Sequence, residues 1–533
     1  MLTTRVLCDL FLVTLVAAQN YTERFRPQYH FTSPKNWIND PNGLLFHDNE
    51  YHMFYQYSPN STVWNDISWG HAVSTDLTHW KQLPIALDSL RDRAGPGSEM
   101  FFSGSAVFDS SSVTGFGNST HRPLIAIYTS YYTANMTLPS GKKVLDNQQA
   151  QSLAYSTDNG LTWTEDFANN PIIELPPTQY VDQWQNFRDP YAFWYEPGQH
   201  WVLVASLADL HILLIYHSTN LRDWIQVSQF GHFNDVGGQW ECPGMFPLPV
   251  DGDEKNVKWV VQVGVNPNGP FPLGSGVQYF IGSFDGTTFT ADSDDVYGTQ
   301  AANWVDYGPD HYATTSYNGL ATYERIAISW MNDWSYGAEI PTTPWRSAMT
   351  LPRKYTLKTI SERVRLVQTP MGLNGLGGAA PIYHNTINTT STTRMKLPVS
   401  GKALDINLKF APGTNSTEFG LDVRTDHDTV RTTIGYYFNA AQLYLDRIDS
   451  GNTTFYPTFR EIYYAPLEPA EDGTISLRIL LDWSSVEVFG GQGETVLTAQ
   501  IFPPDDATGL TLWSFGETSN ITVSVKSVKS SWT

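Results

Sequence analysis

Ala72-Val73-Ser74-Thr75-Asp76-Leu77-Thr78-His79-Trp80 is the first of four related segments that decide the fold. Similar segments follow at residues 154–163, 215–224 and, more loosely, 281–289, at spacings of 82, 61 and 66 residues. Each has the pattern of a strand that ends in an Asx turn and is followed by an aromatic residue. Each interval has room for four antiparallel strands, and repetition at such a period is typical of a β-propeller. Four copies over about 340 residues predict five blades, one of them diverged, unless these turns recur by chance.

Other segments alternate apolar and polar residues, which is the pattern of half-buried strands. Such segments lie at residues 51–57, 124–128, 201–205, 259–263 and 325–330. After Arg353 the pattern changes: glycines gather in residues 372–378, and short alternating strands follow in the C-terminal part of the chain. We therefore predict an all-β protein with a five-bladed β-propeller at residues 19–358, a flexible linker at 359–380 and a β-sandwich at 381–533.

Charge excludes several classes of partner. The 533 residues carry a net charge of −21, and only 16% of them are charged. A protein that binds nucleic acid or an anionic membrane needs a basic patch, and no cluster of Lys and Arg supplies one. We therefore expect neither nucleic acid nor membrane as a partner. Aromatic residues make up 14% of the chain, which excludes a disordered protein or a collagen.

The N-terminus has the features of a secretory signal peptide at residues 1–18. Arg5 precedes a short apolar run at 10–16, and Val16-Ala17-Ala18 offers a small-residue cleavage site. Its removal takes Cys8 away and leaves Cys242 without a disulfide partner. We expect a soluble secreted protein. Its N-glycosylation sequons lie at Asn20, Asn60, Asn118, Asn135, Asn388, Asn415, Asn452 and Asn520.

Three carboxylates have settings that suit catalysis. Asp40, Asp189 and Glu241 each lie near an aromatic residue and just before a proline that fixes the backbone. Any one of them alone fits a turn or a cap, but a propeller brings equivalent strands of different blades together at one end of its axis. Glycoside hydrolysis needs a pair of carboxylates of this kind. No metal-ligand spacing occurs in the sequence. Residues 375–380 formally match a dinucleotide-binding fingerprint, but no strand precedes them and no helix follows, so we interpret them as linker and expect neither a metal nor a cofactor.

The motifs around these carboxylates resemble the signature motifs of glycoside hydrolase family 32, the invertase, inulinase and levanase family. The matching segments are residues 37–43, 188–190, 241–243, 54–57, 69–72, 102–105, 330–334, 344–347 and 482–489. The resemblance covers nearly the whole mature chain. It implies a five-bladed propeller followed by a β-sandwich, in agreement with the repeats.

The resemblance also implies a role for each residue. Asp40 is expected to be the nucleophile, Glu241 the general acid and base, and Asp189 a stabiliser of the transition state that holds fructose hydroxyls. Arg188 is expected to position the sugar and the carboxylates. The other residues expected to line the fructose pocket are Asn39, Gln56, Trp64, Ser103 and Trp334.

These expectations define a secreted, retaining β-fructofuranosidase, and exo-inulinase is the preferred activity because the resemblance links Asp40 and Cys242 with exo action. Invertase and fructosyltransferase are the nearest alternatives, and an inactive sugar-binding propeller is an alternative of another class. The expected substrates are fructans or sucrose, and the protein is expected to be a monomer or a homodimer. Cys242 and Trp240 are expected to form an apolar wall beside Glu241. Further stacking faces for a fructan chain are expected at Trp69, Trp184 and Trp240.

Overall fold

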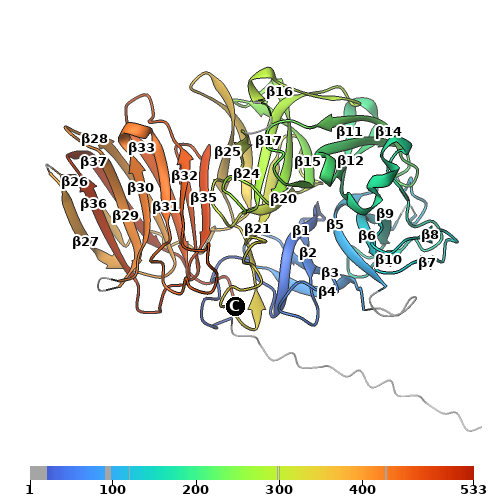
Figure 1. The fold of residues 1–533 in the computed structure, drawn as a ribbon, viewed down its shortest axis with the longest axis horizontal. Helices are drawn as coiled ribbons and strands as arrows, with labels where there is room; N and C mark the ends of the chain where they lie inside the picture. The colour runs from blue at the N-terminus through green and yellow to red at the C-terminus, as the bar shows by residue number, and fades with distance from the viewer. Residues whose placement is uncertain are drawn as a thin grey trace, which may run out of the picture.

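The computed structural model describes residues 21–90, 98–118, 120–296, 298, 301–389, 391–426 and 429–532. The expected signal peptide at 1–18 and the sequon at Asn20 lie outside the described residues. Two β-rich bodies lie side by side, the propeller in blue to yellow and the C-terminal body in orange to red (Figure 1). The helices in the described part are the short 3₁₀ segments η1 (Thr178–Asn186), η2 (Glu196–Gly198), η3 (Ala208–Leu210), η4 (Ser293–Asp295) and η5 (Phe438–Ala440). None of these helices is long and apolar enough to cross a membrane.

The first three blades of the propeller are separate antiparallel sheets. Blade 1 consists of β1 (Asn36–His47), β2 (Glu50–Tyr57), β3 (Ser68–Ser74) and β4 (Lys81–Leu87), with the short β22 (Trp345–Arg346) parallel to the start of β1. Blade 2 consists of β5 (Glu99–Phe108), β6 (Leu124–Tyr132), β9 (Gln149–Ser156) and β10 (Thr164–Glu165), with a side hairpin of β7 (Met136–Thr137) and β8 (Lys143–Val144). Blade 3 consists of β11 (Phe187–Tyr195), β12 (His200–Leu207), β13 (Ile212–Ser218) and β14 (Ile225–Gly231).

Blades 4 and 5 are joined into one sheet by a single parallel contact between Val250 and Leu357. Blade 4 consists of β15 (Gln239–Val250), β16 (Asp253–Asn266), β17 (Gly276–Phe284), β18 (Phe289–Ala291) and β19 (Asn303–Trp304). Blade 5 consists of β20 (Tyr312–Ser316), β21 (Arg325–Met331), β23 (Ala348–Met349), β24 (Arg353–Ile360) and β25 (Arg363–Pro370).

The innermost strands close a ring around the propeller axis. Strand β1 contacts β5, β5 contacts β11, β11 contacts β15, β15 contacts β20, and β20 returns to β1. Residues at equivalent depths on these strands therefore face one another across the axis. The five-bladed architecture predicted from the repeats is confirmed.

The four repeated segments occupy the same place in blades 1 to 4, where the third strand turns into the outermost strand. Each turn contains an Asx side chain that accepts hydrogen bonds from backbone amides just after it. In the first, Asp76 Oδ1 accepts from the amides of Thr78 and His79 at 2.9 and 2.8 Å. The equivalent acceptors are Asp158, Asn220 and Asp285. Blade 5 lacks this turn and is the diverged copy.

Middle strands of the blades are buried on both faces because each blade packs between two others. All residues of β3 are buried, and so are all those of β12 except His200. Ile127 of β6 and Leu203 of β12 belong to one apolar cluster that fills the space between blades 2 and 3. Each such side chain contributes about 1.5–3 kcal/mol when it leaves water, which explains how the propeller is stable without a disulfide.

The C-terminal body is a sandwich of two six-stranded sheets around one apolar core. One sheet has the order β26 (Tyr383–Thr389), β37 (Thr518–Ser527), β28 (Leu404–Pro412), β33 (Ile475–Asp482), β34 (Ser485–Gly490) and β35 (Thr495–Gln500). The other has the order β27 (Thr393–Ser400), β36 (Gly509–Phe515), β29 (Glu418–Thr425), β30 (Thr432–Tyr437), β31 (Gln442–Asp446) and β32 (Ile462–Pro466).

The connection between the two bodies is shorter than the linker expected at 359–380. Strands β24 and β25 form a hairpin that continues to Pro370, so residues 371–382 make the connection. Leu376 within it is 4% exposed and packs in an apolar cluster with residues of the sandwich. This part of the connection is therefore held by packing.

Buried charges fasten the propeller to the sandwich. Arg353 of β24 donates to Asp306 of the propeller at 2.9 Å and to Glu487 of β34 at 2.7 Å, and all three side chains are almost fully buried. His30, which precedes β1, hydrogen-bonds Asp482 at 2.9 Å and Glu487 at 2.8 Å. Since every partner is charged and hydrogen-bonded, the interface fixes one orientation of the two bodies.

Candidate active site

Asp40, Asp189 and Glu241 converge at one end of the propeller axis. They lie on β1, β11 and β15, which are innermost strands of blades 1, 3 and 4. In each strand the pairing register shifts at the carboxylate, which marks a β-bulge there. A proline follows each carboxylate within two residues and cannot donate to the ladder, which favours a bulge at that point. The bulges turn the carboxylates out of the sheets and toward the axis.

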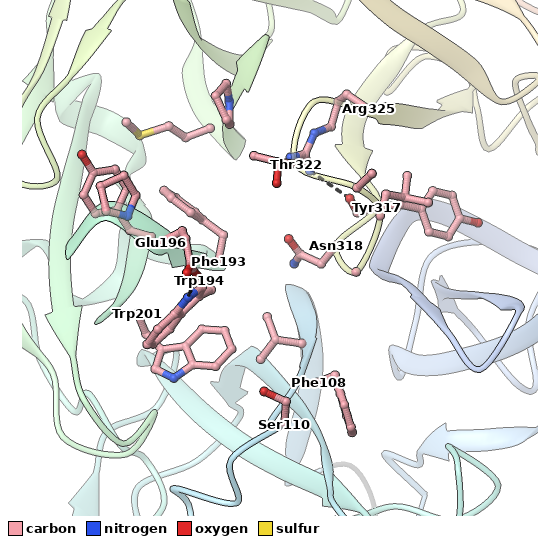
Figure 2. Close-up of a pocket in the computed structure, with 18 of the residues that line it drawn as sticks. Phe108, Ser110, Phe193, Trp194, Glu196, Trp201, Tyr317, Asn318, Thr322 and Arg325 are labelled. Atoms are coloured by element: carbon pink, nitrogen blue, oxygen red, sulfur yellow. Dashed lines mark hydrogen bonds between the residues drawn. The ribbon is translucent and has the colours of Figure 1, made fainter. Parts of the chain in front are cut away.

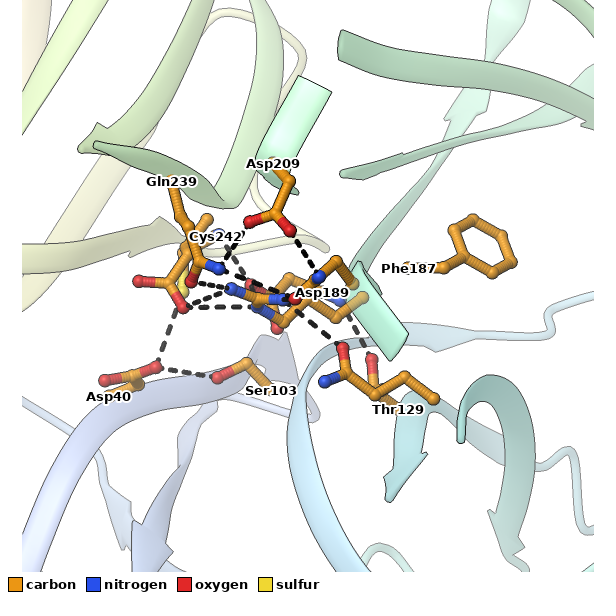
Figure 3. A network of polar contacts seen from close by, with 12 residues as sticks. Asp40, Ser103, Thr129, Phe187, Asp189, Asp209, Gln239 and Cys242 are labelled. Carbon is orange, nitrogen blue, oxygen red and sulfur yellow. Dashed lines mark hydrogen bonds and ion pairs between the residues drawn. The ribbon is translucent and has the colours of Figure 1, made fainter. Parts of the chain in front are cut away.

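The neighbours of Asp40 hold it in one orientation. Its Oδ1 accepts a hydrogen bond from Asn39 Nδ2 at 3.0 Å. Its Oδ2 accepts from Ser103 Oγ at 2.8 Å and from Cys242 Sγ at 3.4 Å (Figure 3). Trp37 Nε1 in turn donates to Asn39 Oδ1 at 2.7 Å. Burial raises the pKa of Asp40, the hydrogen bond from Asn39 opposes that rise, and the charge of Glu241 adds to it.

Glu241 has a cation on one oxygen and a phenol on the other. Its Oε1 accepts hydrogen bonds from Arg188 Nε at 3.1 Å and Nη2 at 2.9 Å, and its Oε2 accepts from the hydroxyl of Tyr312 at 2.5 Å. Burial raises the pKa of Tyr312, so its hydroxyl keeps its proton and remains a donor. The side chain of Glu241 is 19% exposed, which leaves it accessible from the mouth of the site.

Asp189 combines a left-handed backbone conformation with a raised pKa. Its φ of 64° lies in the left-handed region, where its amide donates to Thr129 Oγ1 at 2.9 Å. Its Oδ2 accepts from the amide of Cys242 at 2.9 Å and lies 3.9 Å from Arg188 Nε. Burial raises the pKa of Asp189 to about 7, although the Arg188 guanidinium opposes the rise.

Cys242 contributes an apolar surface and two hydrogen-bond donors, its thiol and its backbone amide. Its thiol pKa is raised well above the usual range by burial and by the charges of Asp189 and Asp40. A protonated thiol that donates to Asp40 is neither a nucleophile nor a metal ligand. Its own φ of 50° presents the backbone amide to Asp189.

A second layer behind Arg188 was not predicted from the sequence. Arg188 Nη2 donates to Gln239 Oε1 at 2.6 Å, and Nη1 donates to Asn186 Oδ1 at 3.2 Å. The amides of Gln239 and Asn186 both donate to the carboxylate of Asp209, each at 2.6 Å (Figure 3). Asp209 lies in η3, so a residue from a loop fixes the guanidinium that holds Glu241. Neither Asp209 nor Tyr312 belongs to a motif, and only their places in the strand order could have indicated them.

Comparison with known proteins identifies the family. The N-terminal domain of glycosyl hydrolases family 32 matches residues 30–370, and the C-terminal domain of that family matches residues 375–529. The chain belongs to glycosyl hydrolase family 32.

Its relatives include fructan-degrading enzymes from fungi and bacteria. It is 49% identical over 526 residues to an extracellular exo-inulinase of Aspergillus ficuum, with 98% of each chain covered, and 41% identical to a levanase of Bacillus subtilis, with 96% of this chain and 71% of the levanase covered. The crystal structure of an exo-inulinase from Aspergillus awamori matches with a TM-score of 0.93 at 49% identity, covering 96% of this chain and 100% of that chain.

The candidate site unites most, but not all, of the predicted residues in one hydrogen-bonded network. Asn39, Asp40, Ser103, Arg188, Asp189 and Glu241 lie within it. Gln56 lies outside: it is 2% exposed, and its amide donates to the carbonyl of Phe101 at 2.9 Å. Trp64 is 39% exposed and meets the edge of Phe102. Trp334 packs against Trp37 and Trp330.

The prediction of a stacking face is wrong for Trp69 and for Trp240. Trp69 and Trp240 are both 0% exposed, so neither presents a face to a ligand. Trp240 also does not form a wall beside Glu241, because adjacent residues of a strand point to opposite faces. Its indole instead donates to the carbonyl of Asp235 at 2.8 Å and packs between blades 3 and 4. Trp184 lies in η1 and is partly exposed.

The described residues contain no group of three or more His, Cys, Asp and Glu side chains placed to hold a metal ion. The hydrogen-bond donors to the three carboxylates are amides, hydroxyls, the thiol of Cys242 and the guanidinium of Arg188. The arrangement is suited to chemistry in which carboxylates supply the nucleophile and the proton.

Proposed function

We propose that the protein is a secreted, exo-acting, retaining β-fructofuranosidase that releases terminal fructose from inulin, with levan and sucrose as further substrates. The observation that carries this proposal is the contrast between Asp40 and Glu241. Asp40 accepts hydrogen bonds from Asn39, Ser103 and Cys242, while Glu241 is held by Arg188 and Tyr312 at the more open side of the site. The exo-inulinase and levanase relatives support the substrate class.

In the first step Asp40 attacks C2 of the terminal fructosyl residue. The bond from C2 to the leaving-group oxygen breaks, and Glu241 gives its proton to that oxygen. A fructosyl–Asp40 ester and a shortened chain result. The positive charge that develops at the sugar is stabilised by the surrounding carboxylates. Among the described residues, Arg188 is the cation that contacts them.

In the second step a water molecule attacks C2 and gives a proton to Glu241, while the ester bond to Asp40 breaks. Two inversions leave the anomeric configuration unchanged, so the first product is β-fructose. Asp189 takes no proton from the reaction and binds fructose hydroxyls. With a pKa of about 7 it is protonated at acidic pH and can then donate as well as accept hydrogen bonds.

Exo action follows from the depth of the site. Asp40 and Asp189 are 8% and 5% exposed, and Arg188 behind them is 6% exposed. A chain end can reach residues buried to this degree, whereas the middle of a polymer needs an open cleft.

Seven sequon asparagines lie in the described part of the chain, and all are exposed, which supports glycosylation of a secreted protein. They are Asn60, Asn118, Asn135, Asn388, Asn415, Asn452 and Asn520. The relatives that are named extracellular support the same location. We propose a monomer or a homodimer as the working form.

Initial rates on sucrose, inulin and levan, with the product sizes recorded, test the substrate proposal. We expect free fructose as the main early product from inulin. Early oligosaccharides of three or more units would show endo action, and negligible inulin turnover beside fast sucrose hydrolysis would show an invertase. Fructose transferred to a second sugar at the expense of hydrolysis would show a fructosyltransferase.

Variants of the carboxylates test the mechanism. Asp40→Asn should remove nearly all activity on every substrate, and Glu241→Gln should spare a fructoside with a good leaving group because it needs little protonation. Asp48→Asn is the matched control, because Asp48 is exposed just beyond the far end of β1. Its φ of 50° is a left-handed conformation that asparagine also adopts. More than a few per cent of activity in Asp40→Asn, or an α-fructose first product by NMR, contradicts the mechanism.

A further inference from the structure

A second cavity lies at the end of the propeller axis opposite to the candidate active site. Its volume is about 620 Å³, which is within the range of small-molecule sites. The far ends of the innermost strands form it: Phe108 is the last residue of β5, and Phe193 and Trp194 are near the end of β11. We call it the axial cavity, and the residues that matter for its chemistry are Phe108, Trp194, Glu196, Asn318, Thr322 and Arg325 (Figure 2).

The axial cavity is separate from the candidate active site. Asp189 and Phe193 are four residues apart on β11, which corresponds to roughly 13 Å along an extended strand. Between the two ends, Asn318 Nδ2 donates to the carbonyls of Ala106 on β5 and Ala192 on β11, both at 3.0 Å. This amide ties two blades together across the axis and separates the two sites.

One side of the axial cavity is a fixed aromatic surface. Trp194 lies near the end of an innermost strand, and 40% of its surface is exposed. Its Nε1 donates to Glu196 Oε2 at 2.6 Å, and its ring meets the edge of Trp201 at 5.2 Å between centroids. The indole is therefore held in one orientation with much of its surface open to solvent. Such a ring is suited to stacking against a flat apolar ligand face.

The other side carries a cation, Arg325. Arg325 lies across the cavity from Trp194 and Glu196, next to Thr322 (Figure 2). Its Nη1 donates to the carbonyl of Tyr317 at 2.8 Å, but its Nε–H is buried and has no hydrogen-bond partner among the described residues. A guanidinium at the wall of the cavity can donate hydrogen bonds to the oxygen atoms of a ligand.

The charges around the axial cavity favour a neutral ligand. Glu196 and Asp109 line it together with Arg325, so the lining has no net positive charge. Asp109 is 0% exposed, and its carboxylate accepts hydrogen bonds from Val113 and Thr114. An anion would meet an acidic protein with a net charge of −21. A sugar instead offers an apolar ring face for Trp194 and hydroxyl oxygens for Arg325 and Thr322.

We propose that the axial cavity binds a neutral oligosaccharide, and that its ligand is a short fructan chain. The choice of fructan rests on the proposed function, because a fructan is then the oligosaccharide that surrounds the enzyme at high concentration. The second site keeps a polymer on the molecule while its end is hydrolysed at the other end of the axis.

Isothermal titration calorimetry with the trisaccharide 1-kestose tests the site. In Asp40→Asn, which binds without hydrolysis, we expect two molecules bound per chain. In Asp40→Asn/Trp194→Ala we expect one, with the affinity of the remaining site unchanged within twofold. Trp194→Phe in the same background should retain the second molecule, because it keeps a ring. Ile225→Ala is the matched control: Ile225 is 71% exposed on an outer strand, and its loss should leave two molecules bound.

One molecule of 1-kestose in Asp40→Asn overturns the proposal whether or not the Trp194 variants fold, and so do two molecules that survive Trp194→Ala. Equal affinity for maltotriose, which contains no fructose, overturns the fructan assignment, and displacement by sulfate shows an anion site instead. In the otherwise unchanged enzyme, Trp194→Ala should leave kcat/KM on sucrose within twofold. Failure of the wild-type enzyme to release fructose from 1-kestose would contradict the proposed function, and the Trp194-dependent molecule would still report on the cavity.

Discussion

Replacing His30 with glutamine tests how the sandwich is held to the propeller. His30 is fully buried between the carboxylates of Asp482 and Glu487, at 2.9 and 2.8 Å. Burial alone would lower the pKa of this imidazole, but its hydrogen bonds to the two carboxylates raise the pKa from 6.5 to about 9. The folded protein therefore holds a proton on His30 that the unfolded chain releases near neutral pH.

The magnitude follows from that difference. A pKa of about 9 against 6.5 corresponds to about 3 kcal/mol of stability at acidic pH. Since the folded pKa is raised, this contribution is complete below pH 6.5 and falls below about 1 kcal/mol as the pH reaches 9. Burial would raise the pKa of Glu487, but the Arg353 charge and the hydrogen bond from His30 lower it to about 2. The contribution of Glu487 to stability is therefore complete above about pH 4.5 and is lost as the pH falls toward 2. Both contributions are complete between about pH 4.5 and 6.5.

Thermal unfolding at pH 5 and pH 9 measures the effect. We expect His30→Gln to lower Tm by roughly 6–12 °C at pH 5, taking about 2–4 °C per kcal/mol for a domain of the size of the sandwich, and by no more than about 4 °C at pH 9. His79→Gln is the matched control, because His79 pairs with Asp76 at the surface with both side chains more than 40% exposed. An equal loss at both pH values would refute the role of the buried proton.

Four further predictions concern the candidate active site and the surface. Cys242→Ala should keep at least about a tenth of the turnover, because the thiol provides only a 3.4 Å contact to Asp40, and complete loss of activity in a folded variant would contradict this. Asp209→Asn should lower kcat/KM by about three- to tenfold with Tm unchanged, since it weakens the support of Arg188, and unchanged kinetics would contradict it. Asp189→Asn should raise Tm at pH 8 but not at pH 4, because burial gives Asp189 a pKa of about 7 and ionisation above that pH charges a buried group; differential scanning fluorimetry decides. Endoglycosidase treatment of the secreted protein should lower its mass, and mass spectrometry of the peptides should place the glycans on exposed sequon asparagines.

The sequence predicted the architecture because the deciding signal is local. The Asx turn needs only a short polar side chain and the amides that follow it, so it is visible in residues 72–80 and again in each of the next three blades. The end of the propeller was misplaced for a related reason. Ser361 and Glu362 turn β24 into β25 with φ values of 48° and 65°, a conformation that usually carries Asn-Gly or Asp-Gly. Without those residues the hairpin has no turn signal.

The convergence of the three carboxylates could be predicted because the sequence marks the backbone at each of them. Prolines after the three carboxylates break the ladder, and the bulges they favour are a property of a few consecutive residues. Tyr312 and Asp209 carry no such mark, because their roles depend on which blade faces which loop. The error at Trp240 has the same origin: the residue next to a carboxylate in sequence lies on the other face of the strand.

The candidate active site brings three carboxylates together around Arg188, the one cation that contacts them in the described part of the chain, and the fold shows how that excess of negative charge is tolerated. Asp40 and Asp189 both have raised pKa values, chiefly because they are buried, so the site favours protonation and stores unfavourable energy at neutral pH. Backbone and side-chain donors such as the amide of Cys242 and the hydroxyl of Ser103 lower that energy without adding a cation that would oppose the positive charge of the transition state. The rest is offset by blades buried on both faces and by the charged interface around Arg353, which lie outside the site. A propeller can therefore hold three carboxylates close together at one end of its axis because its stability is supplied elsewhere.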